Sequence, residues 1–555
     1  MSIINQSYTS SSSKLGLRRA SGSLSSTRLG LVAALSLCAG FGVSLANAQE
    51  INEQGWTVLE PSEDTRFIFV SSSSGNDLNS GYSPAKAVKS FERAKELVRE
   101  DSADWMLLKR GDVWYEGMGS WKVSGRSAEE RLVIASYGDA EERPKLLLSS
   151  ENGIKSGSND VVNHVAIIGL HFEGDRAVDV STRGIRWLAS GENFLIEDCY
   201  IAGFKDNVTI EATGGQFYNF AMRRSVIVDA WSTDGHSQGL FMNRVTGSTI
   251  QENVFDHNGW NESFTDAGAS QFNQNIYVQE GVTGVEFLGN ITTRASGAGV
   301  QMRSGGNAID NLIYANPLGM RFGYRTVDWP NEQATGSIIG NVVLGGPLSD
   351  PEGDSIGMWI ERVADTEVRE NVVAHYHEVA VARDSSVTRA ITLNGFARNV
   401  EITENVVYDW SDDLGNGLAL KSSVREGDSV SFLNNQWYMP GIDRLFSIND
   451  STGMNFSSNE VYGVESSDDV FHIDGSLMNY DEWNEQSYVG HDDLESPVFP
   501  DPRGRDLDMY AQHLGFADAD AFIAAARNQS RSHWDQELTG WAAAEWIRAG
   551  YIVQD

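Results

Sequence analysis

The chain has 555 residues, with 42 Lys and Arg against 77 Asp and Glu, and a formal net charge of −35 at pH 7. A protein this acidic does not bind nucleic acid or an anionic membrane surface through its mean electrostatic field. The internal repeat described below makes length a poor guide to domain number and favours one solenoid over several globular domains.

Residues 1–48 have the features of a secretory signal. Four basic residues precede an apolar run over residues 29–45, and Ala46-Asn47-Ala48 offers a small-x-small cleavage site before Gln49. We expect export to the periplasm or the cell exterior. A membrane anchor is the alternative, which the shortness of the apolar run disfavours. Cleavage would leave 38 Lys and Arg against 77 Asp and Glu, and Cys199 without a second cysteine for an intramolecular disulfide.

The mature chain opens with a strand pattern at residues 66–70, a turn-rich segment and a helical pattern at residues 85–100 behind Ser83-Pro84. A second strand pattern covers residues 105–109. The sequence over residues 69–94 and 107–117 resembles the opening of right-handed parallel β-helix proteins of the pectate-lyase-like kind, many of which act on polysaccharides. The resemblance implies that residues 49–164 form an N-terminal strand and helix cover with the first coils.

A repeat of short strands without helices occupies residues 165–494. A turn Asn recurs in it at intervals of 37, 21, 30, 30, 34 and 30 residues, at Asn253, Asn290, Asn311, Asn341, Asn371, Asn405 and Asn435. Periods of this size with three short strands each predict an all-β solenoid, a right-handed parallel β-helix. We expect each Asn to adopt a left-handed turn conformation and the stacked amides to hydrogen-bond along the axis.

The third strand of each coil alternates apolar and polar residues, so its polar residues share one outer face. Aligning the apolar positions gives two outward columns. The first column is Thr209, Phe241, Tyr277, Gln301, Arg321, Trp359, Thr392, Ala419 and Ser447. The second column is Glu211, Asn243, Gln279, Arg303, Gly323, Glu361, Asn394, Lys421 and Asn449. Aromatic, amide and guanidinium groups gather in the middle coils, which predicts a polysaccharide-binding groove there.

Two further features accompany the repeat. Long loops at residues 229–238 and 257–274 are predicted to wall the groove over Tyr277, Gln301 and Arg321, since long loops on a rigid scaffold commonly carry function. Residues 495–555 contain amphipathic helical patterns, which predict a small helical C-terminal cap.

The groove residues suit β-elimination on a uronic acid, which requires a neutralised carboxylate and a proton carrier. We assign catalytic roles to His236, His257, Tyr277 and Arg321. The histidines could instead organise their loops, and Tyr277 could stack on a sugar. The expected substrate-binding residues are Gln279, Glu280, Arg294, Gln301, Arg303, Tyr324, Trp359 and Lys421.

The segment Asp234-Gly235-His236-Ser237 resembles the Asp-x-His pattern of mannuronan epimerases and related alginate enzymes. The resulting hypothesis is an exported, monomeric polysaccharide lyase acting on an alginate-like glycan. A glycoside hydrolase using Asp234, Asp256, Glu280 or Glu361 is the rival, and an epimerase or a non-catalytic carbohydrate-binding solenoid also stays open. No cofactor is expected, although scattered Asp and Glu leave Ca²⁺ open.

Overall fold

The computed structural model describes residues 50–175, 177–179, 181–324, 333–346, 355–376, 388–412, 416–463 and 469–552, without the side chains of 425–428. The chain divides into compact units at residues 1–60 and 61–555. In the first unit the described part contains an antiparallel bridge between Ile51 and Thr57. The predicted signal peptide and its cleavage site lie outside the described residues. Within those ranges, every helix is too short or too polar to span a membrane.

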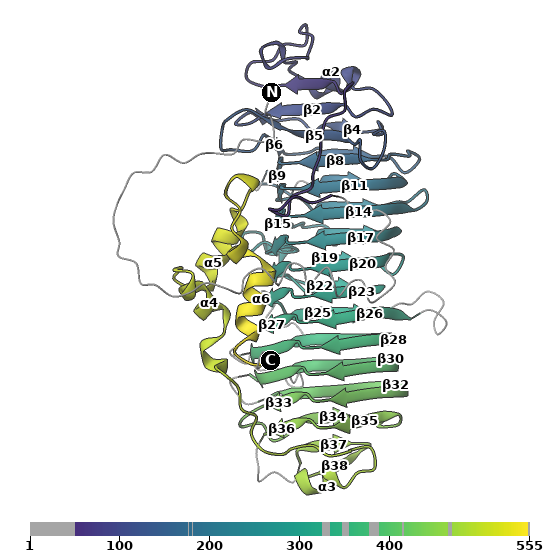
Figure 1. The fold of residues 1–555 in the computed structure, drawn as a ribbon, viewed down its shortest axis with the longest axis vertical. Coiled ribbons are helices and arrows are strands. Elements are labelled where there is room, and N and C mark those ends of the chain that lie inside the picture. The colour runs from purple at the N-terminus through teal and green to yellow at the C-terminus, as the bar shows by residue number, and fades with distance from the viewer. Residues whose placement is uncertain are drawn as a thin grey trace. The chain divides into compact units, whose positions relative to one another are not determined.

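The second unit is a parallel β-helix, as the sequence predicts (Figure 1). Each complete coil has a first, a second and a third strand, and every strand pairs in parallel with its counterparts in adjacent coils. The first strands are β1 (Phe67–Val70), β2 (Trp105–Lys109), β5 (Leu132–Tyr137), β8 (Val165–Ile168), β11 (Gly191–Glu197), β14 (Phe217–Arg223), β17 (Val245–Gln251), β20 (Thr283–Leu288), β23 (Gly305–Ile309), β26 (Ala334–Ile339) and β35 (Met454–Ser457).

The second strands form a separate 13-stranded sheet. They are β3 (Val113–Trp114), β6 (Lys145–Leu148), β9 (His171–Gly174), β12 (Tyr200–Ala202), β15 (Val226–Val228), β18 (Val254–Asp256), β21 (Ile291–Thr293), β24 (Leu312–Tyr314), β27 (Val342–Leu344), β29 (Val372–Tyr376), β31 (Val406–Trp410), β33 (Gln436–Tyr438) and β36 (Glu460–Tyr462).

The third strands carry the outward face on which the sequence predicts a groove. They are β4 (Gly119–Ser120), β7 (Ile154–Ser156), β10 (Arg183–Trp187), β13 (Asp206–Glu211), β16 (Gln238–Asn243), β19 (Gln274–Val278), β22 (Ala298–Met302), β25 (Leu318–Gly323), β34 (Phe446–Ile448) and β37 (Phe471–Ile473). In β28 (Ile356–Arg369), β30 (Arg389–Thr403) and β32 (Leu418–Leu433), one continuous strand serves as a third strand and then as the next first strand.

Parallel pairing begins at β1, which pairs with β2, so the coils start well before residue 165. The predicted N-terminal helix is α2 (Phe91–Leu97), preceded by the 3₁₀ turn η1 (Pro84–Lys86). Ser90 caps α2 by accepting a hydrogen bond from Arg93 N, and Phe91 and Ala94 are buried in the main core. This packing covers the apolar side chains of the first coil.

The core follows the period of two in the third strands. Ile276, Val300, Met320 and Met358 lie on successive coils and all are fully buried. Each such side chain contributes about 1.5–3 kcal/mol through burial. The alternate residues consequently point outward at fixed positions on a rigid sheet.

The repeated asparagines form a ladder inside the column. Asn253, Asn290, Asn311 and Asn341 each donate from Nδ2 to Oδ1 of the next Asn, over 2.8–3.1 Å. The predicted amide stacking is therefore confirmed, but the predicted left-handed backbone is wrong. The residue before each Asn takes that conformation, since φ is 54° at Glu252, 57° at Gly289, 49° at Asp310 and 66° at Gly340.

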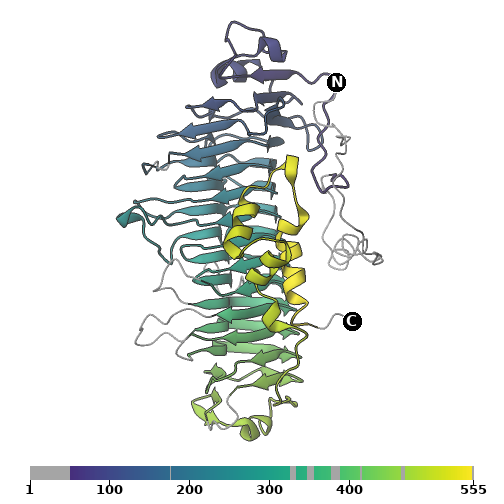
Figure 2. The ribbon, with the colours of Figure 1, turned by 90° about the vertical axis from the view of Figure 1, so that its left-hand side faces the viewer.

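The C-terminal helices α4 (Leu507–His513), α5 (Ala519–Arg527) and α6 (Gly540–Arg548) lie along the side of the column, beside the second strands (Figure 2). Leu507, Phe522 and Ile547 are buried there against Val254, Leu312 and other second-strand residues. The short turns η3 (Pro502–Gly504), η4 (Arg531–His533) and η5 (Gln536–Leu538) connect this segment. The predicted C-terminal helices thus cover a lateral sheet.

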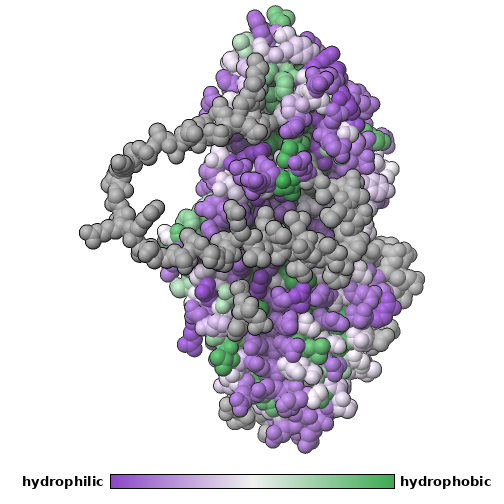
Figure 3. Space-filling view, viewed as in Figure 1, coloured by the Kyte–Doolittle hydropathy of each residue, from purple (hydrophilic) through white to green (hydrophobic). Residues whose placement is uncertain are grey.

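The final coils close differently. Strand β38 (Ser476–Met478) pairs antiparallel with β37, and α3 (Tyr480–Asn484) follows it. Trp483 of α3 is fully buried and stacks on Phe471 of β37. The face shown in Figure 3 is mainly hydrophilic, with apolar residues in small groups, in keeping with the acidic composition.

Candidate functional site

The outward row of the third strands has the register that the alternation predicts. Tyr277 pairs with Gln301, Gln301 with Arg321, and Arg321 with Trp359, so these four residues occupy consecutive coils. Coils are about 4.8 Å apart, so the row continues for roughly 14 Å. A rigid sheet therefore presents an aromatic, an amide, a guanidinium and an indole in line.

Further along the row the predicted register is wrong by two residues. Thr392 pairs with Lys421 and not with Ala419, and Lys421 pairs with Ser447. Lys421 therefore belongs to the first column, and Ala419 is fully buried. Burial lowers the pKa of Lys421, and neighbouring Arg389 lowers it further.

Arg303 connects the two columns. Its Nη1 donates hydrogen bonds to Tyr277 Oη over 3.2 Å and to Gln279 Oε1 over 3.1 Å. Its Nη2 pairs with Glu280 Oε2 at 3.4 Å. Three predicted site residues are thereby held together by a fourth.

Arg321 is the centre of a second group. Its Nη2 pairs with Glu361 Oε2 at 2.6 Å, and its guanidinium lies 4.7 Å from the Trp359 ring and 4.4 Å from the Tyr324 ring. Arg303 contacts the same Tyr324 ring at 4.8 Å, and Arg362 contacts it at 4.9 Å. Three guanidiniums therefore surround one aromatic ring, and two of them, Arg303 and Arg321, are also paired with Glu280 and Glu361.

Tyr324 itself has an unusual backbone. Its φ of 75° is rarely adopted by a bulky residue, and the neighbouring Gly323 has φ 95°. A hydrogen bond from Tyr324 N to Glu361 O, 2.7 Å long, fixes the turn. Strain maintained in this way commonly marks a functional position. We call Tyr277, Gln279, Glu280, Gln301, Arg303, Arg321, Tyr324, Trp359 and Glu361 the third-strand site.

Buried polar atoms without partners occur in the same row. Arg321 Nε, Trp359 Nε1 and Thr392 Oγ1, on three consecutive coils, have no hydrogen-bond partner among the described residues. Such atoms cost about 1–3 kcal/mol each. They also occur elsewhere in the described chain, as at Trp187 Nε1 and Trp437 Nε1, so they do not distinguish this row.

The two predicted catalytic histidines lie apart from this row. His236 is on the exposed turn before β16, and its ring meets Phe272 edge-on with ring centres 5.8 Å apart. His257 follows β18, at the corner between second and third strands. Its Nδ1 is 3.2 Å from Asp229 Oδ1 and its Nε2 is 3.2 Å from Glu262 Oε2.

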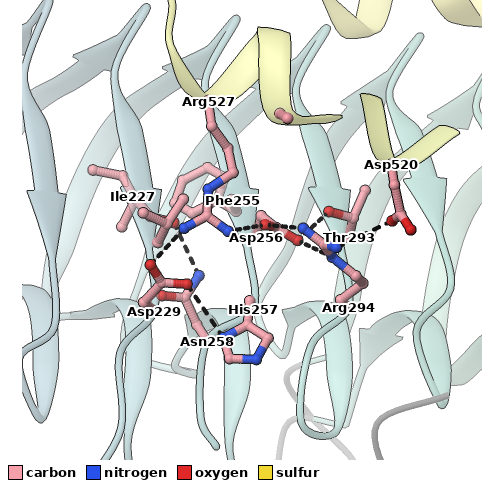
Figure 4. Close-up of polar contacts among 12 residues, drawn as sticks. Ile227, Asp229, Phe255, Asp256, His257, Asn258, Thr293, Arg294, Asp520 and Arg527 are labelled. Carbon is pink, nitrogen blue, oxygen red and sulfur yellow. Dashed lines mark hydrogen bonds and ion pairs between the residues drawn. The ribbon is translucent and has the colours of Figure 1, made fainter. Parts of the chain in front are cut away.

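The predicted substrate ligand Arg294 also lies at this corner (Figure 4). Its Nε and Nη2 donate to both oxygens of Asp256, over 2.7 and 2.6 Å, and its Nη1 reaches Asp520 of α5 at 3.2 Å. From α5, Arg527 pairs with Asp256 and with Asp229. Burial lowers the pKa of Arg527, but Asp256 and Asp229 raise it more, and the net pKa is above its usual value.

These ion pairs border a cavity of about 420 Å³, which we call the corner pocket. It is lined by Asp229, Trp231, His257, Trp260, Asn261, Glu262, Ser263, Phe264, Arg294 and Arg527. The long loop after β18, which contains the 3₁₀ turn η2 (Thr265–Ala267), supplies six of these ten residues. This part of the loop therefore faces the C-terminal helices, whereas its far end, with Phe272, leads into β19.

The four carboxylates considered for hydrolysis fall in different places. Asp256 is fully buried and held by arginines, and the Asp234 side chain is 92% exposed. Only Glu280 and Glu361 belong to the third-strand site. Within the described residues no group of three or more His, Cys, Asp or Glu is placed to hold a metal ion.

Two participants were not singled out from the sequence. Arg362 lies within β28 at an irregular position, with φ 53° and a register shift between Glu361 and Val363, so the alternation that marks outward residues breaks there. Arg527 lies 271 residues from its partner Asp256, and nothing local relates them. A positive charge within an amphipathic helical pattern was the one feature of the sequence that could have suggested Arg527 as a partner for a buried carboxylate.

No protein-family model matches the chain, and no curated protein matches it. Among solved structures it is similar to a lacto-N-biosidase of Eubacterium ramulus, at 11% identity over 78% of this chain and 68% of that chain, with a TM-score of 0.34. A pectate lyase is 11% identical over 79% and 82% of the chains, with a TM-score of 0.30. The A-module of a mannuronan C-5 epimerase of Azotobacter vinelandii is 13% identical over 65% and 90%, with a TM-score of 0.40. These likenesses concern the fold alone.

Proposed function

We propose that the protein is a carbohydrate-active enzyme, a lyase that cleaves a uronic acid-containing polysaccharide by β-elimination at the third-strand site. The observation that carries the proposal is the hydrogen bond from Arg303 Nη1 to Tyr277 Oη, with Arg321 two coils away in the row of Tyr277. A cationic donor stabilises negative charge on the phenolic oxygen as its proton leaves.

The reaction divides among these residues. Arg321 binds the sugar carboxylate and neutralises the charge that builds up on it when the C5 proton is removed. Tyr277, acting as the phenolate that Arg303 stabilises, takes that proton, the C4–O4 bond breaks as the C4–C5 double bond forms, and the phenol then gives the proton to O4 of the leaving chain and returns to the phenolate. The backbones of Tyr277 and Arg321 are two coils, or about 10 Å, apart, a distance that their long side chains and one sugar ring can span.

The other site residues position the polymer. Trp359 offers aromatic surface to a neighbouring sugar, and the Tyr324 ring, surrounded by the guanidiniums of Arg303, Arg321 and Arg362, orients those groups. Gln301 lies between Tyr277 and Arg321, within reach of the same ring. His236 is assigned no direct role, because its exposed turn gives it no contact with these residues in the described structure.

Glycoside hydrolysis is the second candidate, because Glu280 and Glu361 both lie in the site. Paired carboxylates of glycosidases are roughly 5–9.5 Å apart. Glu280 and Glu361 extend from coils three steps apart, which places their backbones about 14 Å from each other. Each carboxylate is also paired with an arginine, through Arg303 and Arg321. Two carboxylates this far apart, each paired with an arginine, are better suited to holding Arg303 and Arg321 in place than to acting as the acid and base of hydrolysis.

A panel assay tests the proposal. The full chain is incubated with alginate, pectate and hyaluronan and with neutral xylan and galactan, and both ultraviolet absorbance of unsaturated chain ends and reducing ends are followed. Elimination predicts that both signals rise together on an acidic polymer. Reducing ends without absorbance would refute the lyase and support the hydrolase. Saturable binding without either signal would indicate a non-catalytic solenoid.

A further inference from the structure

We infer that the corner pocket is a second ligand site, one that binds a neutral sugar unit. Its volume of about 420 Å³ falls in the range of small-molecule sites, about 300–1,000 Å³, and suits one or two sugar rings. The pocket shares no residue with the third-strand site. It would therefore add a function to the solenoid beyond cleavage.

The charges of the pocket argue against an ionic ligand. Its two guanidiniums are already paired, since Arg294 binds Asp256 and Asp520, and Arg527 binds Asp256 and Asp229. An incoming anion would have to compete with two carboxylates at each guanidinium, whereas Arg321 of the third-strand site pairs with Glu361 alone among the described residues. For a cation, no group of three ligating side chains occurs among the described residues. A neutral, hydroxyl-rich molecule meets neither obstacle.

The remaining lining matches the two sides of a sugar. The half-buried Trp260 and Phe264 supply aromatic surface for the C–H face, and Trp231 stacks behind Phe264 with ring centres 4.3 Å apart. The His257 imidazole and the Glu262 carboxylate, 3.2 Å apart, form the polar part of the lining. These groups can donate hydrogen bonds to sugar hydroxyls and accept hydrogen bonds from them. Aromatic and polar groups in one small cavity favour a saccharide over a purely apolar ligand.

The pocket is formed in advance of binding. Within its loop, Asn261 N donates to Ala267 O over 2.8 Å, and Ala267 N donates to Phe264 O over 2.9 Å. Trp260 Nε1 donates to Arg294 O over 3.0 Å, which anchors the ring to the solenoid. Arg527 closes the opposite wall from α5. Little ordering is left for a ligand to impose, so even a small sugar can bind measurably.

Binding of methyl glycosides to the full chain tests this inference. Saturation-transfer NMR and tryptophan fluorescence are recorded with the methyl glycosides of glucose, galactose, mannose, xylose and glucuronic acid. In the Arg321→Ala variant, which lacks the carboxylate-binding group of the third-strand site, we expect saturable millimolar binding of at least one neutral glycoside and weaker binding of the glucuronide. No saturable binding by any neutral glycoside, or preferred binding of the glucuronide by this variant, would overturn the inference.

Variants locate the binding. Glu262→Gln should weaken it by at least about tenfold, and its 68% exposed side chain can change without disturbing packing. Trp260→Ala should abolish it, with circular dichroism confirming the fold. The matched control Glu401→Gln, exposed on β30, should bind normally. Arg321→Ala should also bind normally, even where it removes polysaccharide cleavage. Binding that survives both pocket variants, or that Arg321→Ala removes, would contradict the assignment.

Discussion

Replacing Asn341 by Ala removes one step of the internal ladder. The Asn341 side chain is fully buried. Its Nδ2 donates to Asn371 Oδ1 over 3.0 Å and to Ala308 O over 2.8 Å, and its Oδ1 accepts from Asn311 N over 3.1 Å and from Asn311 Nδ2 over 2.8 Å. Four hydrogen bonds along the column therefore depend on one side chain.

The groups left behind determine the cost. Asn371 Oδ1 still accepts from Asn341 N, and Asn311 Nδ2 still donates to Phe287 O. The Asn311 N–H loses its Asn341 acceptor, and Ala308 O loses the Nδ2 donor. With about 1–3 kcal/mol for a buried polar group left without its partner, we expect a loss of about 2–4 kcal/mol in unfolding free energy.

Urea unfolding measures this loss through the transition midpoint at constant slope. Hydrogen exchange should show that the coils around β26 and β28 lose protection first. Asn455→Ala is the matched control, since Asn455 is an exposed strand residue and its replacement should change stability by no more than about 0.5 kcal/mol. Equal midpoints for the two variants would refute the role given to the ladder.

Two further predictions concern charge. Arg527→Met should lower the local stability of α5 by about 2 kcal/mol, measured by hydrogen exchange, because Asp229 loses its arginine, whereas Asp256 keeps Arg294. Unchanged exchange would argue that apolar packing alone holds the helix. His171, with Nε2 3.3 Å from Glu173 Oε2, and Lys145, with Nζ 2.8 Å from the same oxygen, lower the pKa of Glu173 from 4.5 to about 2, although burial raises it. Its stabilising contribution is present above about pH 4.5 and is lost as pH falls towards 2. Glu173→Gln should therefore be less acid-sensitive in urea titrations between these pH values, and an identical pH profile would contradict this origin.

The coils and the middle of the outward row could be predicted from sequence because alternation is a local property. Each apolar residue of the third strands must enter the same narrow core, so Tyr277, Gln301 and Arg321 had one consistent register. At residues 417–421 this constraint fails. Both Leu418 and Leu420 are apolar, so two registers satisfy the core equally, and only the structure places Lys421 beside Thr392.

The division into two sites could not be predicted. His257 and Arg294 stand at a corner of the coil, where alternation no longer fixes the direction of a side chain. Their partners Asp520 and Arg527 come from a helix more than two hundred residues later. Periodicity also says nothing about which side of the column that helix covers, because both outer sheets carry polar and apolar residues.

The central claim is that the row through Tyr277 and Arg321 performs elimination, and one comparison tests it most directly. Arg186 belongs to the same outward row, next to Thr209 and five coils from Arg321, which makes Arg186→Ala a matched control for Arg321→Ala. On the acidic polysaccharide that the protein cleaves, initial rates of unsaturated-end absorbance are measured for both. We predict that Arg321→Ala lowers the rate by about 10²-fold or more and that Arg186→Ala leaves it unchanged. Equal rates for the two variants would contradict the claim.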